Sequence, residues 1–596
     1  MLQSLAFLPA LRLALSKPST SIQLCLIGLS GGLIAAAVII VFRLSLEILH
    51  KFMLGNVGEY SALPSWQLFL LPIFAVLLII AFAKLTGFKH YRLGIPYVIH
   101  RFKLFYGRIP FASSLNQFFG GILALASGFV VGKEGPTVHL AAAASHYVGR
   151  WFKLPYNSLR ILAGCGIAAG IAAAFNTPFA AVIFVMEVVM REYKVHIFVP
   201  VLLAAACGSF MTRMVFGDVS ELSFLSFNHM QYWHFPLLIL LGMFLGVLAS
   251  LFNSQLMRIM RLCRPLSMST RLIMAAFITG SVAYFMPSAM GAEFVNIDAF
   301  LNNTPETTAI LLLFTAKFLL AMTAIALGVP GGIIGAVMVI GILAGVLFLQ
   351  PLQMLLASID LAPASLSENY ALLGLAGFLA AVLHAPMAAL SAAMELSSTQ
   401  QVILPAIITI VSAYVTSKQL CSNRSIFVLQ LDYQALPYTT TPIRDTLQDT
   451  GVLAIMRNDV KIFEAGQDAD MYAYLQEQPN ALVVNRTVRE VIDTASEEID
   501  SVTALANIEA DISEPTLRHR YDWQLVSLDI SLQENAYPLT LHQLPCLSEQ
   551  NTMAEVYELL YKKRQGGVMI YAQNHNQLSG LITWNMLHTY LLRQRH

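Results

Sequence analysis

Long apolar stretches recur along the first 435 residues of the chain, and few charged residues interrupt them. Each stretch is long enough to cross a bilayer as a helix, or to enter it as a shorter half-helix. The pattern predicts membrane segments at residues 22–49, 66–84, 115–131, 138–152, 159–174, 178–190, 195–216, 235–257, 270–287, 308–327, 331–350, 369–383, 386–397 and 402–420. Several segments are short and broken by Gly or Pro, and irregular backbone at membrane depth survives only where protein buries it or where it lines a polar cavity. The breaks therefore indicate a transport path.

The composition agrees with a polytopic all-α membrane protein whose first partner is the lipid bilayer. Of the 596 residues, 57% are hydrophobic and 12% are charged, whereas a soluble protein has about 25% charged residues. The six cysteines are scattered without a C-x-x-C pair, so we expect neither disulfides nor a zinc site. We expect no metal, no cofactor and no nucleic-acid partner. A cleavable signal is not expected either, because the first apolar segment is too long and lacks an Ala-x-Ala site.

Basic residues cluster in two of the connections between apolar segments. Six Lys and Arg residues occur between positions 84 and 108, and four Arg residues between 258 and 271. Lys and Arg are enriched in cytoplasmic connections, whereas the connections around Asp218 and Glu293 contain neither and are expected outside. This orientation predicts cytoplasmic N and C termini, with residues 1–20 as a cytoplasmic N-terminal segment. The short tail and the absence of long extensions favour the inner membrane of a bacterium.

The membrane part contains an internal repeat. The segment 176–187 matches the segment 384–395 at an offset of 208, with Pro, Met and Glu in register. The glycine-rich break at 132–136 has a counterpart at 328–335, displaced by 200. Chance similarity between apolar helices is the alternative explanation. Two related halves that each contribute a broken segment are typical of an internally repeated transporter with its site near the membrane midplane.

A carboxylate stands inside the first break, in the segment Gly-Lys-Glu-Gly-Pro at 132–136. The glycines allow the backbone to approach a ligand, and Pro136 opens a helix whose N–H groups and positive dipole end would face an anion. Glu134 could occupy such a site when charged and leave it when protonated, as a gate would. The alternative is that Lys133 and Glu134 merely pair at the membrane boundary. Lys317, inside another apolar segment, could add positive potential to the pathway, but we expect its ammonium group to extend to the interface.

These motifs, with Gly94-Ile95-Pro96 and Ala174 to Pro178, resemble the CLC family of chloride channels and proton-coupled chloride exchangers over residues 20–435. The resemblance implies a homodimer with one chloride pathway per subunit, two inverted-topology repeats at about 66–215 and 270–420 with broken helices, and a transport domain at 21–435. Glu134 matches the gating glutamate of the family. The anion-binding positions that the resemblance implies are Leu93, Gly94, Ile95, Pro96, Lys133, Glu134, Gly135, Ile333, Ile334 and Phe427.

The chain departs from the family pattern at the positions that carry side-chain ligands. Leu93 replaces the usual serine, and Phe427 replaces the usual tyrosine. The Gly-x-Phe-x-Pro element has become Gly-Ile-Ile-Gly-Ala at 332–336. Both hydroxyl ligands are therefore missing, although backbone dipoles can still hold an anion. Anion choice and affinity stay open, and fluoride export is a further alternative, although the intact Gly-Pro after Glu134 and the attached tail are unlike that branch of the family.

Val188 occupies the position at which exchangers of the family usually carry a second, internal glutamate. Valine cannot carry a proton, and proton relays need ionisable residues. This position favours a passive, glutamate-gated chloride channel. A proton-coupled chloride antiporter is the alternative, and a non-conducting regulatory protein derived from the family is a second one. An enzyme is not expected, because motifs such as H-E-x-x-H and G-x-S-x-G are absent.

The composition turns polar beyond about residue 435, which predicts a small cytoplasmic α/β domain at 436–596. Its last part is expected to form a helix at 552–563, strands at 567–571 and 578–583, and a closing helix from Asn585. This order resembles a CBS domain, a module that occurs in pairs, with a degenerate first copy somewhere in 445–500. The resemblance implies that an adenine nucleotide could bind near Thr583 and Asn585. A structural role of the domain is favoured over nucleotide binding, because the usual aspartate is missing.

Overall fold

The computed structural model describes residues 2–19, 21–55, 58–88, 93–217, 227, 230–294, 297, 306–357, 366–397, 399–438, 442–488, 521–528, 537–572 and 578–593. The chain divides into two compact units. One comprises residues 24–150 and 160–439, and the other comprises residues 1–23, 151–159 and 440–596. Asp218 and part of the basic connection at 84–108 lie outside the described residues.

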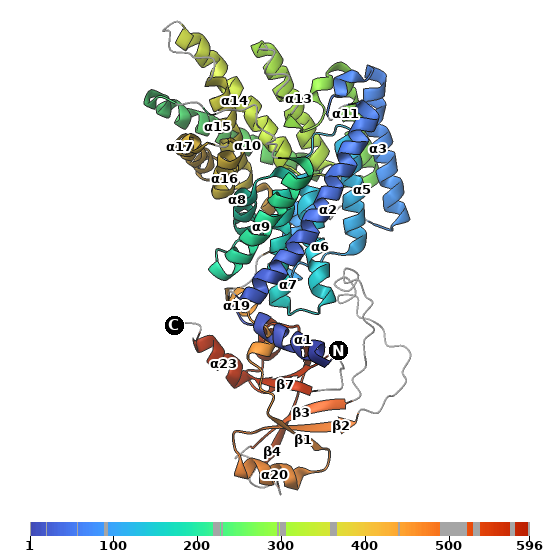
Figure 1. Cartoon of the computed structure of the whole chain (residues 1–596), viewed down its shortest axis with the longest axis vertical. Helices are drawn as coiled ribbons and strands as arrows, with labels where there is room; N and C mark the ends of the chain where they lie inside the picture. The colour runs from blue at the N-terminus through green and yellow to red at the C-terminus, as the bar shows by residue number, and fades with distance from the viewer. Residues whose placement is uncertain are drawn as a thin grey trace. The chain divides into compact units, whose positions relative to one another are not determined.

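The first unit is built of helices (Figure 1), and ten described helices of the chain are long and apolar enough to cross a membrane. The helices are α2 (Ile22–Leu54), α3 (Ser65–Leu85), α4 (Gly94–Leu104), α5 (Phe111–Ala126), α6 (Glu134–Trp151), α7 (Tyr156–Phe175), α8 (Pro178–Phe184) with the π-turn η2 (Val185–Met190), α9 (Val195–Phe216), α10 (Phe235–Leu262), α11 (Met268–Phe285), α13 (Thr307–Ala326), α14 (Ile334–Ala357), α15 (Leu366–Leu383), α16 (Pro386–Ser397), α17 (Ile403–Val415) with the π-turn η6 (Thr416–Leu420), and α18 (Ile426–Tyr433).

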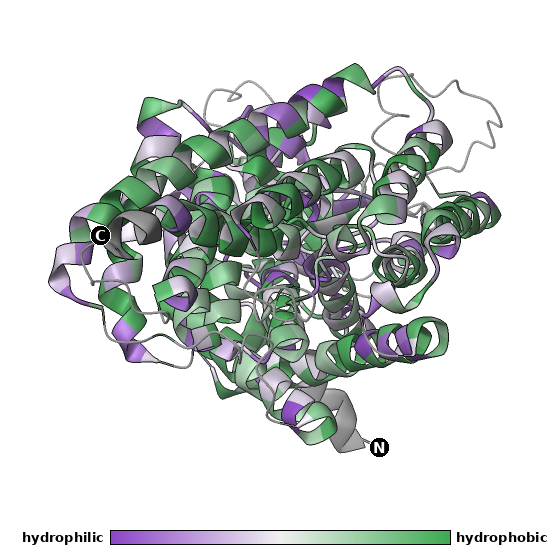
Figure 2. Ribbon diagram, turned by 90° about the horizontal axis from the view of Figure 1, so that it is seen from above, coloured by the Kyte–Doolittle hydropathy of each residue, from purple (hydrophilic) through white to green (hydrophobic). Residues whose placement is uncertain are grey.

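The helices differ in how much of their surface other helices cover. In an apolar stretch of 18 residues, α7 has 94% of the residues buried and α15 has 89%, whereas α3 has 33%. Hydrophobic residues nevertheless dominate the helical ribbon, as Figure 2 shows. Helices such as α7 and α15 therefore form the protein core, and the apolar side chains that α3 leaves exposed are suited to contact with lipid.

Helix α5 ends earlier than the apolar pattern predicts. The predicted segment 115–131 continues through Val131, but α5 ends at Ala126 and α6 begins only at Glu134. Gly128 and Gly328 have φ angles of +79° and +88°, a left-handed conformation that ends α5 and α13 at equivalent places of the two halves. The apolar residues beyond each glycine are buried by protein, so hydropathy alone does not separate them from the helix.

Contacts between the halves follow their pseudo-twofold symmetry. The Glu395 carboxylate accepts hydrogen bonds from the backbone N–H groups of Phe179 and Ala180 at the start of α8, at 2.9 and 2.7 Å. Its counterpart Glu187 accepts equivalent bonds at the start of α16, at 3.2 and 2.7 Å. Each half therefore caps a helix of the other, and negative charge beside a helix N-terminus is favourable. The offset of 208 in the sequence thus reflects a reciprocal contact in space.

The second unit contains two small sheets. Its elements are α1 (Leu2–Leu15), α19 (Pro442–Leu447), β1 (Val460–Glu464), α20 (Asp468–Glu477), β2 (Leu482–Val488), β3 (Tyr521–Leu528), β4 (Leu539–Gln543), β5 (Cys546–Ser548), α22 (Met553–Leu560), β6 (Gly567–Tyr571), β7 (Leu578–Thr583) and α23 (Trp584–Arg593). The sheet orders are β1-β2-β3-β4 and β5-β6-β7.

The two sheets repeat one topology. In the first sheet, β1 and β2 are parallel across α20 and β3 returns antiparallel. In the second, β5 and β6 are parallel across α22 and β7 returns antiparallel. The strands expected at 567–571 and 578–583 are confirmed. Of the strands of the first sheet, β1 and β2 lie inside the window of 445–500 in which we expected a first copy, and β3 and β4 lie beyond it.

Candidate functional site

The two glycine-rich breaks meet directly. Gly132 N–H donates to Gly332 O at 2.8 Å, and Gly332 N–H donates to Gly132 O at 2.6 Å. These residues are equivalent in the two halves at the offset of 200, so the exchanged pair joins matching positions of the repeats. Helices α6 and α14 begin at Glu134 and Ile334, immediately after the pair. The positive N-terminal ends of α6 and α14 therefore both lie beside the Gly132–Gly332 pair.

The Glu134 side chain is 3% exposed and packs against three glycines. A methyl group on Gly132 would overlap its Oε2 atom. A methyl group on Gly332 would lie 2.6 Å from Oε2, and one on Gly335 would lie 2.9 Å from Oε1. The glycines thus create the space that the carboxylate occupies at the start of α14. Gly135 has another role, because a methyl group there would lie 2.7 Å from the carbonyl carbon of Gly331 in the opposite break.

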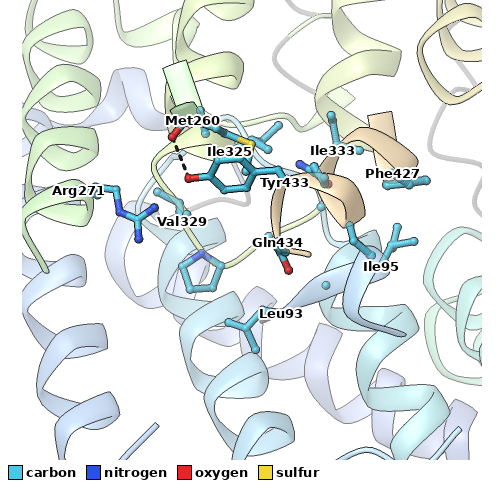
Figure 3. A pocket seen from close by; sticks show the side chains of 18 of the residues that line it. Leu93, Ile95, Met260, Arg271, Ile325, Val329, Ile333, Phe427, Tyr433 and Gln434 are labelled. Atoms are coloured by element: carbon cyan, nitrogen blue, oxygen red, sulfur yellow. Dashed lines mark hydrogen bonds between the residues drawn. The ribbon is translucent and has the colours of Figure 1, made fainter. Parts of the chain in front are cut away.

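A cavity of about 120 Å³, called the inner cavity below, opens beside the second break (Figure 3). Residues at or next to the starts of three helices line it: Leu93 to Pro96 for α4, Gly332 and Ile333 for α14, and Phe427 for α18. Gly94 has a φ of +73°, which lets the backbone turn into α4. Three helix N-termini and their dipoles make this cavity attractive to an anion. The predicted positions at 93–96, 333 and 427 come together here.

Polar side chains that the motifs did not indicate also line the inner cavity. They are Arg271 of α11, Gln430 and Tyr433 of α18, and Gln434 directly after it. The Tyr433 hydroxyl donates to Met260 O at 2.9 Å (Figure 3). Gln430 and Gln434 follow Phe427 at helical spacing, so periodicity along α18 could have indicated them. Arg271 carried no local signal, because only the packing of α11 brings it to the cavity.

A second cavity of about 70 Å³ is almost wholly apolar and is called the apolar cavity below. Its lining includes Glu134, Phe175, Thr177, Ile334 and Ala388. The adjacent residues Ile333 and Ile334 thus line different cavities. Glu134 therefore lies near the division between an inner cavity rich in polar groups and an apolar one.

Four predicted positions lie elsewhere. Lys133 places its Nζ atom 4.5 Å from the centre of the Phe175 ring, a cation–π contact. Val188 is buried in η2 and lines neither cavity. In the other unit, the Thr583 hydroxyl accepts a hydrogen bond from Met586 N–H at 3.4 Å, and the Asn585 side chain is exposed.

A charged cluster follows Val188 in the chain. The Glu192 carboxylate lies 3.1 Å from both the Lys103 and the Lys194 Nζ atoms, and it also accepts a hydrogen bond from Arg160. Burial by itself would raise the pKa of Glu192, but the surrounding cations outweigh burial and lower its pKa to about 2. Glu192 is therefore held ionised, and it joins α4, α7 and the connection between η2 and α9.

The expectation that Lys317 extends to the interface is wrong. Its side chain is fully buried and donates to the carbonyl oxygens of Ala289, Met290 and Gly291 at 3.4, 3.2 and 2.8 Å. Gly291 N–H in turn donates to Gly128 O at 2.8 Å. Lys317 thus fixes the segment that supports the first break.

The family model described as voltage gated chloride channel matches residues 73–418. Among curated relatives, the "Putative chloride channel protein ClcB-like" of Ralstonia nicotianae is 28% identical over 410 residues, which cover 66% of this chain and 92% of the relative. The "H(+)/Cl(-) exchange transporter ClcA" of Vibrio campbellii is 27% identical over 321 residues, which cover 52% of this chain and 67% of the relative.

Solved structures share the fold. A CLC-type fluoride/proton antiporter aligns with a TM-score of 0.57 at 25% identity, over 68% of this chain and 97% of the other. A slow cyanobacterial Cl⁻/H⁺ antiporter aligns with a TM-score of 0.61 at 23% identity, over 69% and 97%. A eukaryotic CLC transporter aligns with a TM-score of 0.58 at 19% identity, over 97% and 98%. The last alignment therefore includes the C-terminal α/β region.

Proposed function

Because the chain belongs to the CLC family of anion transporters, we propose that it exchanges chloride for protons across the membrane. Anion transport is the activity of the family. The relatives include proteins named H(+)/Cl(-) exchange transporters as well as one named a putative chloride channel. These names and the antiporters among the structural neighbours favour the exchanger over the passive channel that Val188 indicated.

The buried position of Glu134 carries the proposal. Its carboxylate fills the space between three glycines at the start of α14, next to both cavities. An anion that binds at this helix start has to displace the carboxylate. A carboxylate that moves from a favourable helix dipole into the apolar cavity is more stable with a proton bound, because apolar surroundings disfavour the charged form. Movement of the anion and uptake of a proton are thereby linked at one residue.

Backbone N–H groups hold the anion in this proposal. The candidates are those of Gly94 and Ile95 in α4, Ile333 and Ile334 at α14, and Lys133 to Gly135 at α6. Leu93 and Phe427 contribute shape but no hydroxyl group. Chloride is the proposed substrate, and fluoride is the second candidate because the neighbour aligned at 25% identity is a fluoride/proton antiporter.

We also propose a homodimer that forms through α8, α9, α16 and α17. Helices α8 and α16 are too short to span a bilayer, yet their residues Phe179 and Met387 are 39% and 53% exposed. On the neighbouring α17, Leu404 and Val411 are each 52% exposed. A second copy would cover short apolar helices that lipid alone fits poorly.

The α/β region at 436–596 is proposed to be a pair of CBS-like modules on the cytoplasmic side of a bacterial inner membrane. The repeated strand-helix-strand-strand order supports the pair. A structural role is favoured over adenine-nucleotide binding, since the Thr583 hydroxyl is engaged by Met586 N–H and Asn585 is exposed.

The test is chloride flux in proteoliposomes under an imposed pH gradient, with the membrane voltage clamped by a potassium ionophore. We expect the proton gradient to drive chloride against its own gradient. Glu134→Gln should remove proton coupling and leave chloride flux, whereas Glu47→Gln, a carboxylate that pairs with Arg43 away from both cavities, should behave as the wild type. Purely downhill flux would restore the channel interpretation, and absence of flux would indicate a non-conducting protein.

A further inference from the structure

The inner cavity contains a cation without a counter-charge. Arg271 lines the cavity, and its Nε atom has no hydrogen-bond partner among the described residues. No Asp or Glu is among the described residues that line the cavity. Figure 3 shows the guanidinium group at the left of the cavity, next to Val329. The Arg271 guanidinium group therefore gives the cavity a positive charge.

The same cavity contains a buried amide that has no partner among the described residues. Gln430 is 8% exposed and lines the cavity one helical turn beyond Phe427. Its side chain makes no hydrogen bond within the described part of the chain. A glutamine amide carries two N–H donors, and at the cavity wall they can face a ligand or water. The fold therefore keeps a donor and a cation at positions that only a bound ligand or water can satisfy.

We propose that the inner cavity binds a monovalent anion through Arg271 and Gln430, which replace the hydroxyl donors missing at Leu93 and Phe427. The inference rests on the proposed function, since it takes this cavity as the cytoplasmic mouth of the anion path. The first backbone N–H groups of α4 and α18 complete the donor set. The site is distinct from the space beside Gly132 that Glu134 fills.

The size and lining of the cavity define the class of ligand. A single water needs about 10–15 Å³ by the same measure, so about 120 Å³ has room for a halide ion with some of its waters. Leu93, Ile95, Met260 and Phe427 make much of the lining apolar. Such a lining disfavours strongly hydrated anions, and the planar guanidinium group suits planar ones. Chloride, bromide and nitrate should therefore bind, and fluoride should bind poorly.

The test is calorimetric titration of the purified full-length protein with sodium chloride, with gluconate as the inert anion. Arg271→Gln should weaken chloride binding about tenfold, the order expected for loss of a charge-assisted hydrogen bond. Gln430→Leu should weaken it by a smaller factor, and Arg271→Lys should restore part of the loss. Arg261→Gln is the matched control, because it removes an equal charge from an exposed position of the same basic connection, outside the cavity.

The same variants separate this inference from the proposed function. Arg271→Gln should raise the chloride KM at the cytoplasmic face and leave the number of protons per chloride unchanged. If Arg271→Gln and Gln430→Leu both bind chloride as tightly as Arg261→Gln, or if the wild type binds none, the inference is wrong. If chloride binding weakens as expected while the wild type shows no proton coupling, the site stands and the exchanger proposal fails.

Discussion

At the scale of residues, glycine determines where the Glu134 carboxylate can lie. Gly132, Gly332 and Gly335 surround it, and a side chain at any of them would take up the same space. The carboxylate thus occupies a position that two chain segments, 200 residues apart, build together. Its neighbour Lys133 packs on the Phe175 ring. The adjacent charges Lys133 and Glu134 therefore make different contacts.

Gly132→Ala tests the role of this space. The new methyl group overlaps Glu134 Oε2. Keeping both groups in place would cost about 1–3 kcal/mol of overpacking, so we expect the carboxylate to be displaced. We expect the variant to transport chloride with a reduced proton-to-chloride ratio in proteoliposomes, although Glu134 is retained. In a Glu134→Ala background the clashing atoms are gone, and Gly132→Ala should then have no further effect. An additional loss in that background would show that the glycine acts on the backbone instead.

At the scale of elements, charged side chains join helices that are distant in the sequence. Glu395 and Glu187 cap α8 and α16 reciprocally. The Glu192 carboxylate forms ion pairs with Lys103 of α4, Arg160 of α7 and Lys194 of the connection before α9. A buried carboxylate shared by several cations is strongly destabilising to remove, because the cations then lose their counter-charge.

Glu192→Gln should accordingly destabilise the protein at pH 7, by about 3–5 kcal/mol. The pKa of Glu192 in the folded protein is about 2, below its ordinary value of 4.5, so its stabilisation is present above pH 4.5 and is lost as the pH falls toward 2. The difference in Tm between wild type and variant should therefore shrink below pH 4.5. Glu558→Gln, which breaks the exposed pair with Arg444, should cost at most about 1 kcal/mol. A difference in Tm that does not change with pH would contradict the ion-pair explanation.

At the scale of the whole molecule, the second unit is assembled from three separate stretches of chain. The Asn157 side-chain amide donates to Leu15 O at 2.9 Å and to Asp449 O at 3.1 Å. Gly451 N–H donates to Ser16 O at 2.8 Å. Helix α1, the connection at 151–159 and the C-terminal region therefore pack together in one unit.

Asn157→Ala tests this assembly. The change removes two hydrogen bonds of a side chain that is 3% exposed, and it should cost about 1–3 kcal/mol. In limited proteolysis we expect α1 and the C-terminal region to be released faster than in the wild type. The rate at which the membrane helices are digested should not change. Asn458→Ala, at an exposed position of the same unit, should leave the digestion pattern as it is in the wild type. Equal rates for both variants would mean that Asn157 does not hold the unit together.

The sequence by itself determined the features that are written in local patterns. Hydropathy predicted the membrane helices, and the offsets of 200 and 208 predicted two related halves. The Gly-Lys-Glu-Gly-Pro segment indicated Glu134 as a candidate functional residue. The positions at 93–96, 333 and 427 line one cavity. The pattern failed at the breaks, since Phe129 to Val131 are apolar without being helical.

Only the tertiary structure decided which distant groups meet. The Gly132–Gly332 pair, the buried ammonium of Lys317 and the Arg271 guanidinium in the inner cavity depend on contacts between helices, which no local periodicity records. Hydropathy reports whether a residue is buried, but protein and lipid bury apolar residues alike. A buried polar group, by contrast, has to find its partner in space, and that partner lies wherever the fold brings a complementary atom.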